Sequence, residues 1–305
     1  IADLWAGGSA DLWLAGVSPR HWDGAGWTDI DCPGVLAGHA VWGAGADDVW
    51  FSGHGGVFHW DGVDCVEVPG SGSHELYGIS GSGPDDVWAV GTGVLHWNGS
   101  GLVEIPAPDP DVLHDVHAVS RDLAWAVGRD ERIAQWDGAT WTNLAVGSGP
   151  DVSRAGPPDL HGVHGTSSTD AWAVGDRGDI LHWDGGAWSR ASSAVTYDDV
   201  VDFWGTSPDD VWAATRWEGL IRWDGTTWSF VPHEIPLNCC GCVWGADSTD
   251  VWVCSRLGGM EHWDGMGWSA FDLEGMYAHA AWGTATDDVW AVGPDGLAGH
   301  WDGSM

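Results

Sequence analysis

The sequence has no lysine, and all ten of its basic residues are arginines. Against 45 acidic residues this leaves a formal net charge of -35. Nucleic acids and anionic membrane surfaces are bound by clustered basic side chains, so the charge argues against both as partners. An acidic surface of this kind favours solubility and loose binding of cations.

Long apolar runs are also missing, and none approaches the roughly 20 residues that a membrane-spanning helix needs. No segment shows apolar spacing at 3.6 residues over a helical length, so we expect no helices. There is no Ser/His/Asp order, phosphate loop or nucleotide fingerprint. A chain without any residue set that specifies a reaction is more typical of a binding protein than of an enzyme.

Tryptophan, by contrast, is abundant, and all but Trp217 of the 27 tryptophans fall into one repeating frame. One series follows an acidic residue, namely Trp13, Trp50, Trp88, Trp125, Trp172, Trp212, Trp252 and Trp290. A second precedes Asp-Gly or Asn-Gly, namely Trp22, Trp60, Trp97, Trp136, Trp183, Trp223, Trp263 and Trp301. The eight copies recur every 37 to 47 residues, a period typical of solenoids, propellers or arrays.

Each copy contains four short segments of strand character separated by Gly, Asp, Ser or Pro turns. In the fifth copy these strands, named a to d, are 160–164, 170–174, 179–183 and 187–190. Asp-Gly between the last two is a strong hairpin signal. Four antiparallel strands repeated eight times predict an all-β, eight-bladed β-propeller. A solenoid would need polar end caps, and the terminal copies resemble the others.

The unbroken repeat predicts a single domain over residues 1–305. Its repeats run approximately over 1–34, 35–70, 71–108, 109–150, 151–192, 193–232, 233–272 and 273–305. The sequence ends just after strand c of the last copy. Strand d of that blade is therefore either supplied by residues outside this sequence or incomplete.

The phrases Asp-Val-Trp-Ala-Val-Gly and His-Trp-Asp-Gly-x-x-Trp resemble a class of bacterial propeller repeats related to Asp-box (BNR-like) repeats. They are well matched at 170–188, 209–228 and 287–303, and the pattern covers essentially the whole chain. The resemblance implies an exported protein, extracellular or in the cell envelope. It implies no activity, because Asp boxes occur as turn motifs in proteins of many functions.

Two sets of polar residues recur too regularly to form a specific site. One set recurs near the turns, namely Asp23, Asp61, Asn98, Asp137, Asp184, Asp224, Asp264 and Asp302 before strand d, and Asp11, Asp48, Asp86, Asp122, Asp170, Asp210, Asp250 and Asp288 near strand b. Short polar side chains there accept local backbone N–H bonds, although weak calcium binding remains an alternative. The other set precedes the strand-c tryptophan and is interpreted as packing, namely His21, His59, His96, His182, His262 and His300.

Departures from the repeat gather in the b–c and d–a links, which share one face of a propeller. Trp217 lies between Arg216 and Glu218 in the b–c link of the sixth copy, and Tyr197 lies in the d–a link that enters it. An aromatic side chain flanked by charges on a loop suits a small molecule, a sugar or a protein partner. These four residues are the candidate ligand-binding set.

A second departure is a series of histidines three residues before the strand-a aromatic position, namely His39, His74, His114, His161 and His279. In the fourth and fifth copies His117 and His164 also replace the strand-a tryptophan. Imidazole binds zinc, copper and iron, so His114 and His161, completed by water or by Asp115 or Asp202, form a candidate zinc or copper site. The alternative is that these histidines pack between blades.

Among the six cysteines, Cys242 is expected opposite Cys254 on paired strands, and a disulfide is the default in an exported protein. Zinc or copper(I) binding, or free thiols, are the alternatives. Cys32 and Cys65 are expected towards opposite ends of neighbouring strands, where a bond would be strained.

Together these observations favour an exported, non-catalytic binding propeller, with its ligand site on the b–c/d–a face near the mouth of the channel and a metal as a possible aid. A glycan-binding lectin using Trp217 is one alternative. A metalloenzyme using histidines of the inner strands is the other.

Overall fold

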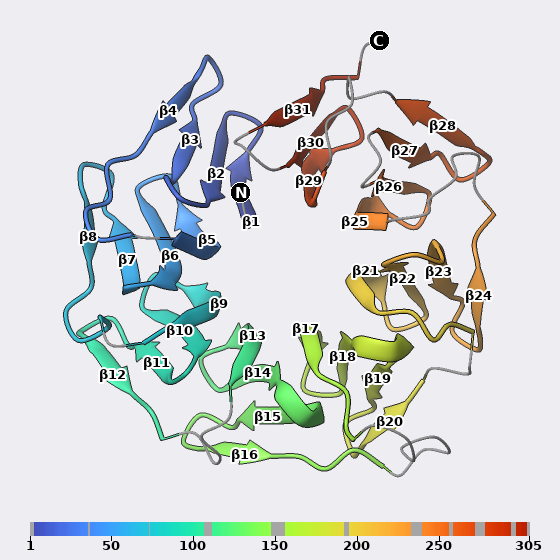
Figure 1. The fold of residues 1–305 in the computed structure, drawn as a ribbon, viewed down its shortest axis with the longest axis horizontal. Coiled ribbons are helices and arrows are strands. Elements are labelled where there is room, and N and C mark those ends of the chain that lie inside the picture. The colour runs from blue at the N-terminus through green and yellow to red at the C-terminus, as the bar shows by residue number, and fades with distance from the viewer. Residues whose placement is uncertain are drawn as a thin grey trace. The chain divides into compact units, whose positions relative to one another are not determined.

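The computed structural model describes residues 3–35, 37–72, 74–106, 112–147, 156–191, 195–232, 240–255, 259–271, 278–293 and 297–303. Most of them form antiparallel strands, grouped into seven sheets of four strands and one of three. Consecutive strands pair in sequence order within every sheet. This is the predicted eight-bladed β-propeller, in which each sheet is one blade (Figure 1).

The first four blades follow the repeat closely. Blade one is β1 (Asp3–Gly8), β2 (Asp11–Ala15), β3 (Arg20–Trp22) and β4 (Trp27–Asp29). Blade two is β5 (Ala37–Gly45), β6 (Asp48–His54), β7 (Gly56–Trp60) and β8 (Cys65–Glu67). Blade three is β9 (Leu76–Gly83), β10 (Asp86–Gly91), β11 (Val94–Trp97) and β12 (Leu102–Glu104). Blade four is β13 (Leu113–Ser120), β14 (Leu123–Gly128), β15 (Arg132–Trp136) and β16 (Trp141–Asn143).

The later blades repeat the pattern. Blade five is β17 (Leu160–Ser167), β18 (Asp170–Gly175), β19 (Ile180–Trp183) and β20 (Trp188–Arg190). Blade six is β21 (Val200–Ser207), β22 (Asp210–Thr215), β23 (Leu220–Trp223) and β24 (Trp228–Phe230). Blade seven is β25 (Cys240–Asp247), β26 (Asp250–Ser255), β27 (Met260–Trp263) and β28 (Trp268–Phe271), and blade eight is β29 (Ala280–Ala285), β30 (Asp288–Val292) and β31 (Ala298–Trp301). Two short 3₁₀ turns, η1 (Arg129–Glu131) and η2 (Asp176–Gly178), lie in b–c links.

The contacts divide the chain into two compact units. The first contains residues 2–173 with 183–188, and the second contains 174–182 with 189–305. Blade five contributes strands to both units.

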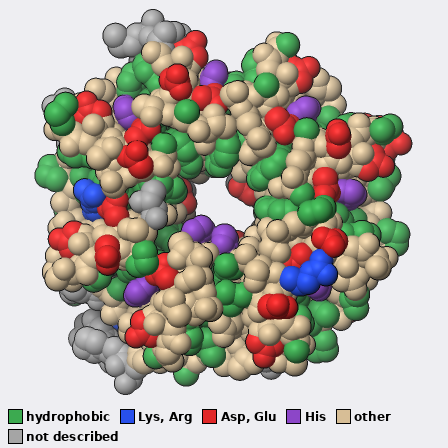
Figure 2. All heavy atoms as spheres, turned by 180° about the vertical axis from the view of Figure 1, so that it is seen from behind, with side chains coloured by type: hydrophobic (Ala, Val, Ile, Leu, Met, Phe, Trp, Pro, Cys, Tyr) green, Lys and Arg blue, Asp and Glu red, His purple; other side chains and the backbone are tan. Residues whose placement is uncertain are grey.

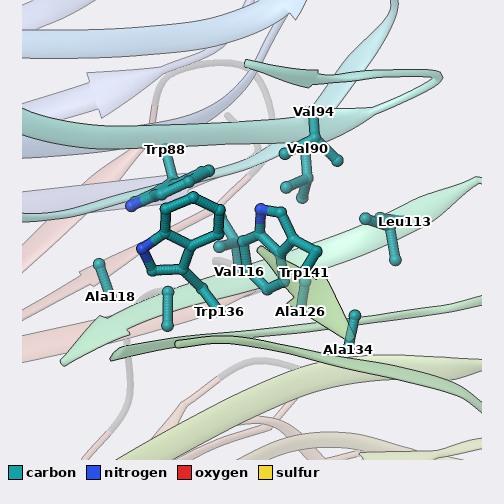
Figure 3. Packing of buried hydrophobic residues seen from close by; sticks show 11 residues of the cluster. Trp88, Val90, Val94, Leu113, Val116, Ala118, Ala126, Ala134, Trp136 and Trp141 are labelled. Carbon is teal, nitrogen blue, oxygen red and sulfur yellow. The ribbon is translucent and has the colours of Figure 1, made fainter. Parts of the chain in front are cut away.

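The core lies between neighbouring blades and is built largely from tryptophan. In the first unit, Trp88 of blade three is fully buried against Trp136 and Trp141 of blade four (Figure 3). The ring centroid of Trp88 lies 4.9 Å from that of Trp136 and 5.1 Å from that of Trp141. Burying a tryptophan removes about 150–250 Å² from water, which makes these residues the main apolar contribution of each repeat.

The turn between strands c and d is held by its own aspartate, as predicted. Asp224 Oδ1 accepts the backbone N–H groups of Thr226 and Thr227 at 2.9 and 2.8 Å. Gly225 has a φ of +86°, and a Cβ there would lie 3.1 Å from the Asp209 side chain. Both constraints explain the recurrence of Asp-Gly at this position.

The aspartates that begin strand b bond to side chains, whereas the sequence predicted hydrogen bonds to local backbone N–H groups. In blade three, Asp86 Oδ1 lies 2.7 Å from Nε2 of His96 on strand c, and the His96 ring stacks on Trp88 at 3.8 Å. The same Asp–His–Trp arrangement occurs in blades one, two, seven and eight. In these five blades the recurring strand-c histidine is thus a packing residue, as interpreted from the repeat.

Blades four and six vary this arrangement in an informative way. In blade six Arg222 replaces the histidine, contacts Asp210 at 2.6 Å and lies over the Trp212 ring. In blade four the residue two before the tryptophan is Leu123, and Gln135 stands opposite Trp125 where histidine is expected. Alignment of Asp122 with the other strand-b aspartates was therefore wrong by one position. In blade four the aspartate and the histidine are therefore replaced together.

Two disulfides are present among the described residues. Cys242 and Cys254 are register partners on β25 and β26, with Cα atoms 5.0 Å apart. Cys32 and Cys65 are also bonded, with Cα atoms 4.8 Å apart, so the expectation of a strained pairing was wrong. Cys32 follows β4 in the d–a link instead of lying on strand d, and this link brings it to the first residue of β8. Cys239 lies outside the described residues.

Candidate functional site

The four candidate ligand-binding residues come together on two adjoining loops of blade six, in the second unit. The link before β21 carries Tyr197, and the link between β22 and β23 carries Arg216, Trp217 and Glu218. We call residues 196–199 and 216–218 the blade-six loop pair.

Hydrogen bonds fix the backbone of the loop pair. The Asp198 carboxylate accepts the backbone N–H groups of both Trp217 and Glu218, the latter at 3.0 Å. Thr196 Oγ1 donates to Glu218 Oε2 at 2.6 Å. The Arg216 backbone N–H donates to the Asp199 carbonyl at 2.8 Å. The two loops therefore form one connected structure.

Asp199 extends this network to blade five. Its carboxylate lies 3.2 Å from Nε of Arg216 and accepts the backbone N–H of Arg177 in η2 at 3.0 Å. Arg177 has a φ of +60°, a left-handed conformation that a side chain adopts only when its surroundings hold it there. The sequence pointed to the aromatic residues of the loop pair, but the anchoring roles of Thr196, Asp198 and Asp199 emerge only from the structure.

The two aromatic side chains project from this fixed backbone into solvent. Trp217 is 62% exposed and Tyr197 is 68% exposed, whereas the frame tryptophans at the start of strand b are buried. The side chains of Arg216 and Glu218 bond within the loop pair, to Asp199 and Thr196 respectively. The loop pair thus offers a partner two aromatic rings beside the exposed Glu218.

The candidate metal-binding histidines are mostly engaged with the protein. His39 Nδ1 donates to the Leu76 carbonyl, and the His39 ring stacks on Tyr77. Burial and Glu75 raise the pKa of Tyr77. The His74 ring lies where a side chain at Gly93 would stand. His279 is exposed, and its backbone N–H bonds to the Val292 carbonyl.

Only His114 and His161 are brought together from that set. Their rings stack with centroids 5.5 Å apart, and His114 Nδ1 donates to the Leu160 carbonyl at 2.9 Å. Among the described residues, no group of three or more His, Cys, Asp or Glu side chains is placed to hold a metal. His114 and His161 belong to the first unit, and the loop pair with His279 belongs to the second.

Asp115 and Asp202, expected to complete a metal site, serve instead to join blades. Asp115 accepts the N–H groups of Val116 and of Val163 on the next inner strand, at 2.8 and 2.9 Å. Asp202 makes the same pair of bonds towards blade seven, and Asp3 towards blade two. Burial raises the pKa of Asp115 to about 7 and that of Asp3 to about 6.

No family model matches the chain, and no curated protein matches it. Solved structures do. YCF48 from Cyanidioschyzon merolae is 18% identical with a TM-score of 0.66, covering 92% of this chain and 99% of that one. A structure of YCF48 bound to D1 peptide is 17% identical with a TM-score of 0.65, covering 95% and 94%. The computationally designed protein Ika8 is 14% identical with a TM-score of 0.78, covering 99% and 96%.

The chain has the β-propeller fold. At these identities the likeness shows the fold alone. Within the described residues, no helix is long and apolar enough to cross a membrane.

Proposed function

We propose that this chain is an exported, non-catalytic propeller that binds a protein or peptide through the blade-six loop pair. The observation that carries the proposal is the contrast between a hydrogen-bonded loop backbone and two exposed aromatic rings upon it. A rigid loop loses little conformational entropy on binding, and Trp and Tyr are the side chains most enriched at binding hot spots.

The charge of the chain narrows the partner to one that presents basic groups. A net charge of -35 attracts cationic segments and repels acidic ones. Figure 2 shows carboxylate side chains spread over the surface visible there, with few arginines among them. Lysine and arginine side chains also bind the faces of tryptophan and tyrosine rings.

Two further observations support parts of the proposal. The propeller of YCF48 occurs in complex with a D1 peptide, so a chain of similar fold accommodates a peptide. Disulfides form in oxidising compartments, which supports export and fits the resemblance to bacterial Asp-box repeats.

A library of fluorescently labelled peptides, graded from acidic to basic, tests the proposal by anisotropy. We expect basic peptides containing an aromatic or proline residue to bind, and Trp217→Ala to weaken binding by about tenfold or more. Phe230→Ala is the matched control, because Phe230 is 46% exposed on β24 of the same blade. Equal affinity of the Trp217→Ala variant and the unaltered chain would reject the loop pair as the site.

A glycan array tests the lectin alternative with the same variants. Exposed Trp217 and Tyr197 also present faces on which a sugar ring can stack. Binding of neutral oligosaccharides that is lost in Trp217→Ala, without any peptide binding, would replace a peptide by a glycan as the ligand.

A further inference from the structure

A second departure from the repeat lies on the inner strands of blades four and five, within the first unit. In blades one, two, six and seven the strand-a tryptophan covers a glycine of the next blade. A Cβ at Gly43, for example, would lie 2.6 Å from the Trp5 ring. His117 on β13 and His164 on β17 occupy the tryptophan position in their blades.

These two imidazoles face one another. Their ring centroids are 4.4 Å apart and the ring planes are inclined by 44°. The His117 ring hydrogen-bonds to the backbone carbonyl of Gly165, which leaves a lone pair on its other nitrogen in the neutral form. Burial lowers the pKa of His117 to about 3 and also lowers the pKa of His164.

The spacing of the rings suits a shared metal ion. An imidazole nitrogen binds zinc or copper at about 2.0–2.1 Å, which places the ring centroid about 3.2 Å from the metal. Two imidazoles at right angles around one ion then have centroids about 4.5 Å apart. The observed centroid distance of 4.4 Å is compatible with this arrangement, which is that of neighbouring ligands in tetragonal Cu²⁺ complexes.

The surroundings of the pair favour a cation as well. The Gly165 carbonyl orients the His117 ring, as carbonyls commonly do for metal-binding histidines. The His164 side chain is exposed, so water or a bound partner can reach the remaining coordination positions. The net charge of -35 raises the local concentration of cations.

We propose that His117 and His164 form an open, two-imidazole binding site for a divalent transition metal ion. Among the divalent first-row metals, Cu²⁺ is the preferred ion. Cu²⁺ heads the affinity order of divalent first-row metals at nitrogen ligands. The site is independent of the blade-six loop pair, and each proposal stands or fails by its own experiment.

The test is a Cu²⁺ titration of chelator-treated, tag-free protein, followed by calorimetry and electron paramagnetic resonance. We expect one tight equivalent whose spectrum shows coupling to two nitrogens. His117→Ala/His164→Ala should lose that equivalent, with at least about a tenfold rise in Kd. His114→Ala/His161→Ala is the matched control, because His161 lies on the same strand as His164 and should leave the signal unchanged.

A second variant guards against loss of folding. His117→Trp restores the residue of the repeat over Gly165, so the variant should fold, as checked by near-ultraviolet circular dichroism, and should not bind the tight equivalent. The proposal is overturned by an unchanged two-nitrogen spectrum in His117→Trp, by the absence of a tight equivalent in the unaltered chain, or by its loss in the His114/His161 control.

Discussion

At the scale of the residue, the structure depends on polar groups that pair inside an apolar frame. The Asp–His–Trp arrangement satisfies a carboxylate next to a buried tryptophan, and the imidazole adds a stacked ring. Blade four shows the coupling, because Leu123 and Gln135 replace both polar partners at once. A half-buried carboxylate without its partner would cost more than the pair contributes.

We therefore predict that Asp86→Ala and His96→Ala each lower the free energy of unfolding by about 1–3 kcal/mol, because each leaves a polar partner unsatisfied. The double variant should show a coupling energy of about 0.5–3 kcal/mol in urea denaturation. Gln135→Ala in blade four is the control and should change stability by less than about 0.5 kcal/mol. Additive effects of the two blade-three variants would show that the pair does not interact.

The raised pKa of Asp115 predicts that the free energy of unfolding depends on pH. Its folded-state pKa, about 7, lies above the ordinary 3.8, so the folded chain favours the protonated form. This contribution to stability is fully present below pH 3.8 and is lost as the pH rises through 7. Between pH 4 and pH 8, Asp115→Asn should remove part of the decline seen in urea denaturation of the unaltered chain.

Asp224→Asn is the contrasting variant, because backbone N–H bonds lower the pKa of the exposed Asp224. The stability that Asp224 contributes is present above its ordinary pKa and is lost on acidification. Asp224→Asn should therefore reduce the decline of stability at acidic pH only. It should cost a modest amount of stability and leave ligand binding unchanged. An Asp115→Asn profile parallel to that of the unaltered chain would contradict the role assigned to Asp115.

At the scale of the element, each blade is a sheet whose turns are nearly alike, so differences between blades lie in their links. The d–a link after β4 places Cys32 at β8 of the next blade, while Cys242 and Cys254 cross-link neighbouring strands of one blade. The loop pair and η2 likewise join the b–c and d–a links of adjacent blades.

We predict that four of the six cysteines, those of the two disulfides, resist alkylation until the protein is reduced. Intact-mass measurement with and without reductant, followed by peptide mapping, should identify Cys32–Cys65 and Cys242–Cys254. Replacing the second pair by serine should cost about 3 kcal/mol or less, because the closed loop is short. Alkylation of all six thiols without reduction would remove the support for both bonds and for export.

At the scale of the whole molecule, the net charge affects both the stability of the fold and the choice of partner. Like charges repel more strongly in the compact state than in the unfolded chain, so a net charge of -35 destabilises folding at low ionic strength. The same field accounts for the preference for cationic partners proposed above.

We predict that the melting temperature rises as sodium chloride is increased from about 10 mM to about 300 mM, because salt screens this repulsion. Over the same range, binding of basic peptides should weaken. Differential scanning calorimetry and anisotropy measure the two effects. A melting temperature that falls with salt would show that attractive ion pairs, such as Arg190–Asp179, outweigh the net repulsion.

The sequence by itself determined the blade number, the strand order and the turn chemistry. These follow from short-range patterns, since the spacing of the tryptophans and the Asp-Gly turns act within one repeat. The exposed aromatics of the loop pair were also visible, because Trp217 is the tryptophan that the frame does not explain.

Only the tertiary structure decided which polar groups meet. Asp115 bonds across to Val163, Cys32 reaches Cys65, and His117 faces His164. Each pair joins different blades, at separations set by the packing of one sheet against the next and by the path of a link. Side-chain direction on the inner strands is decided by that packing, which no pattern within a single repeat encodes.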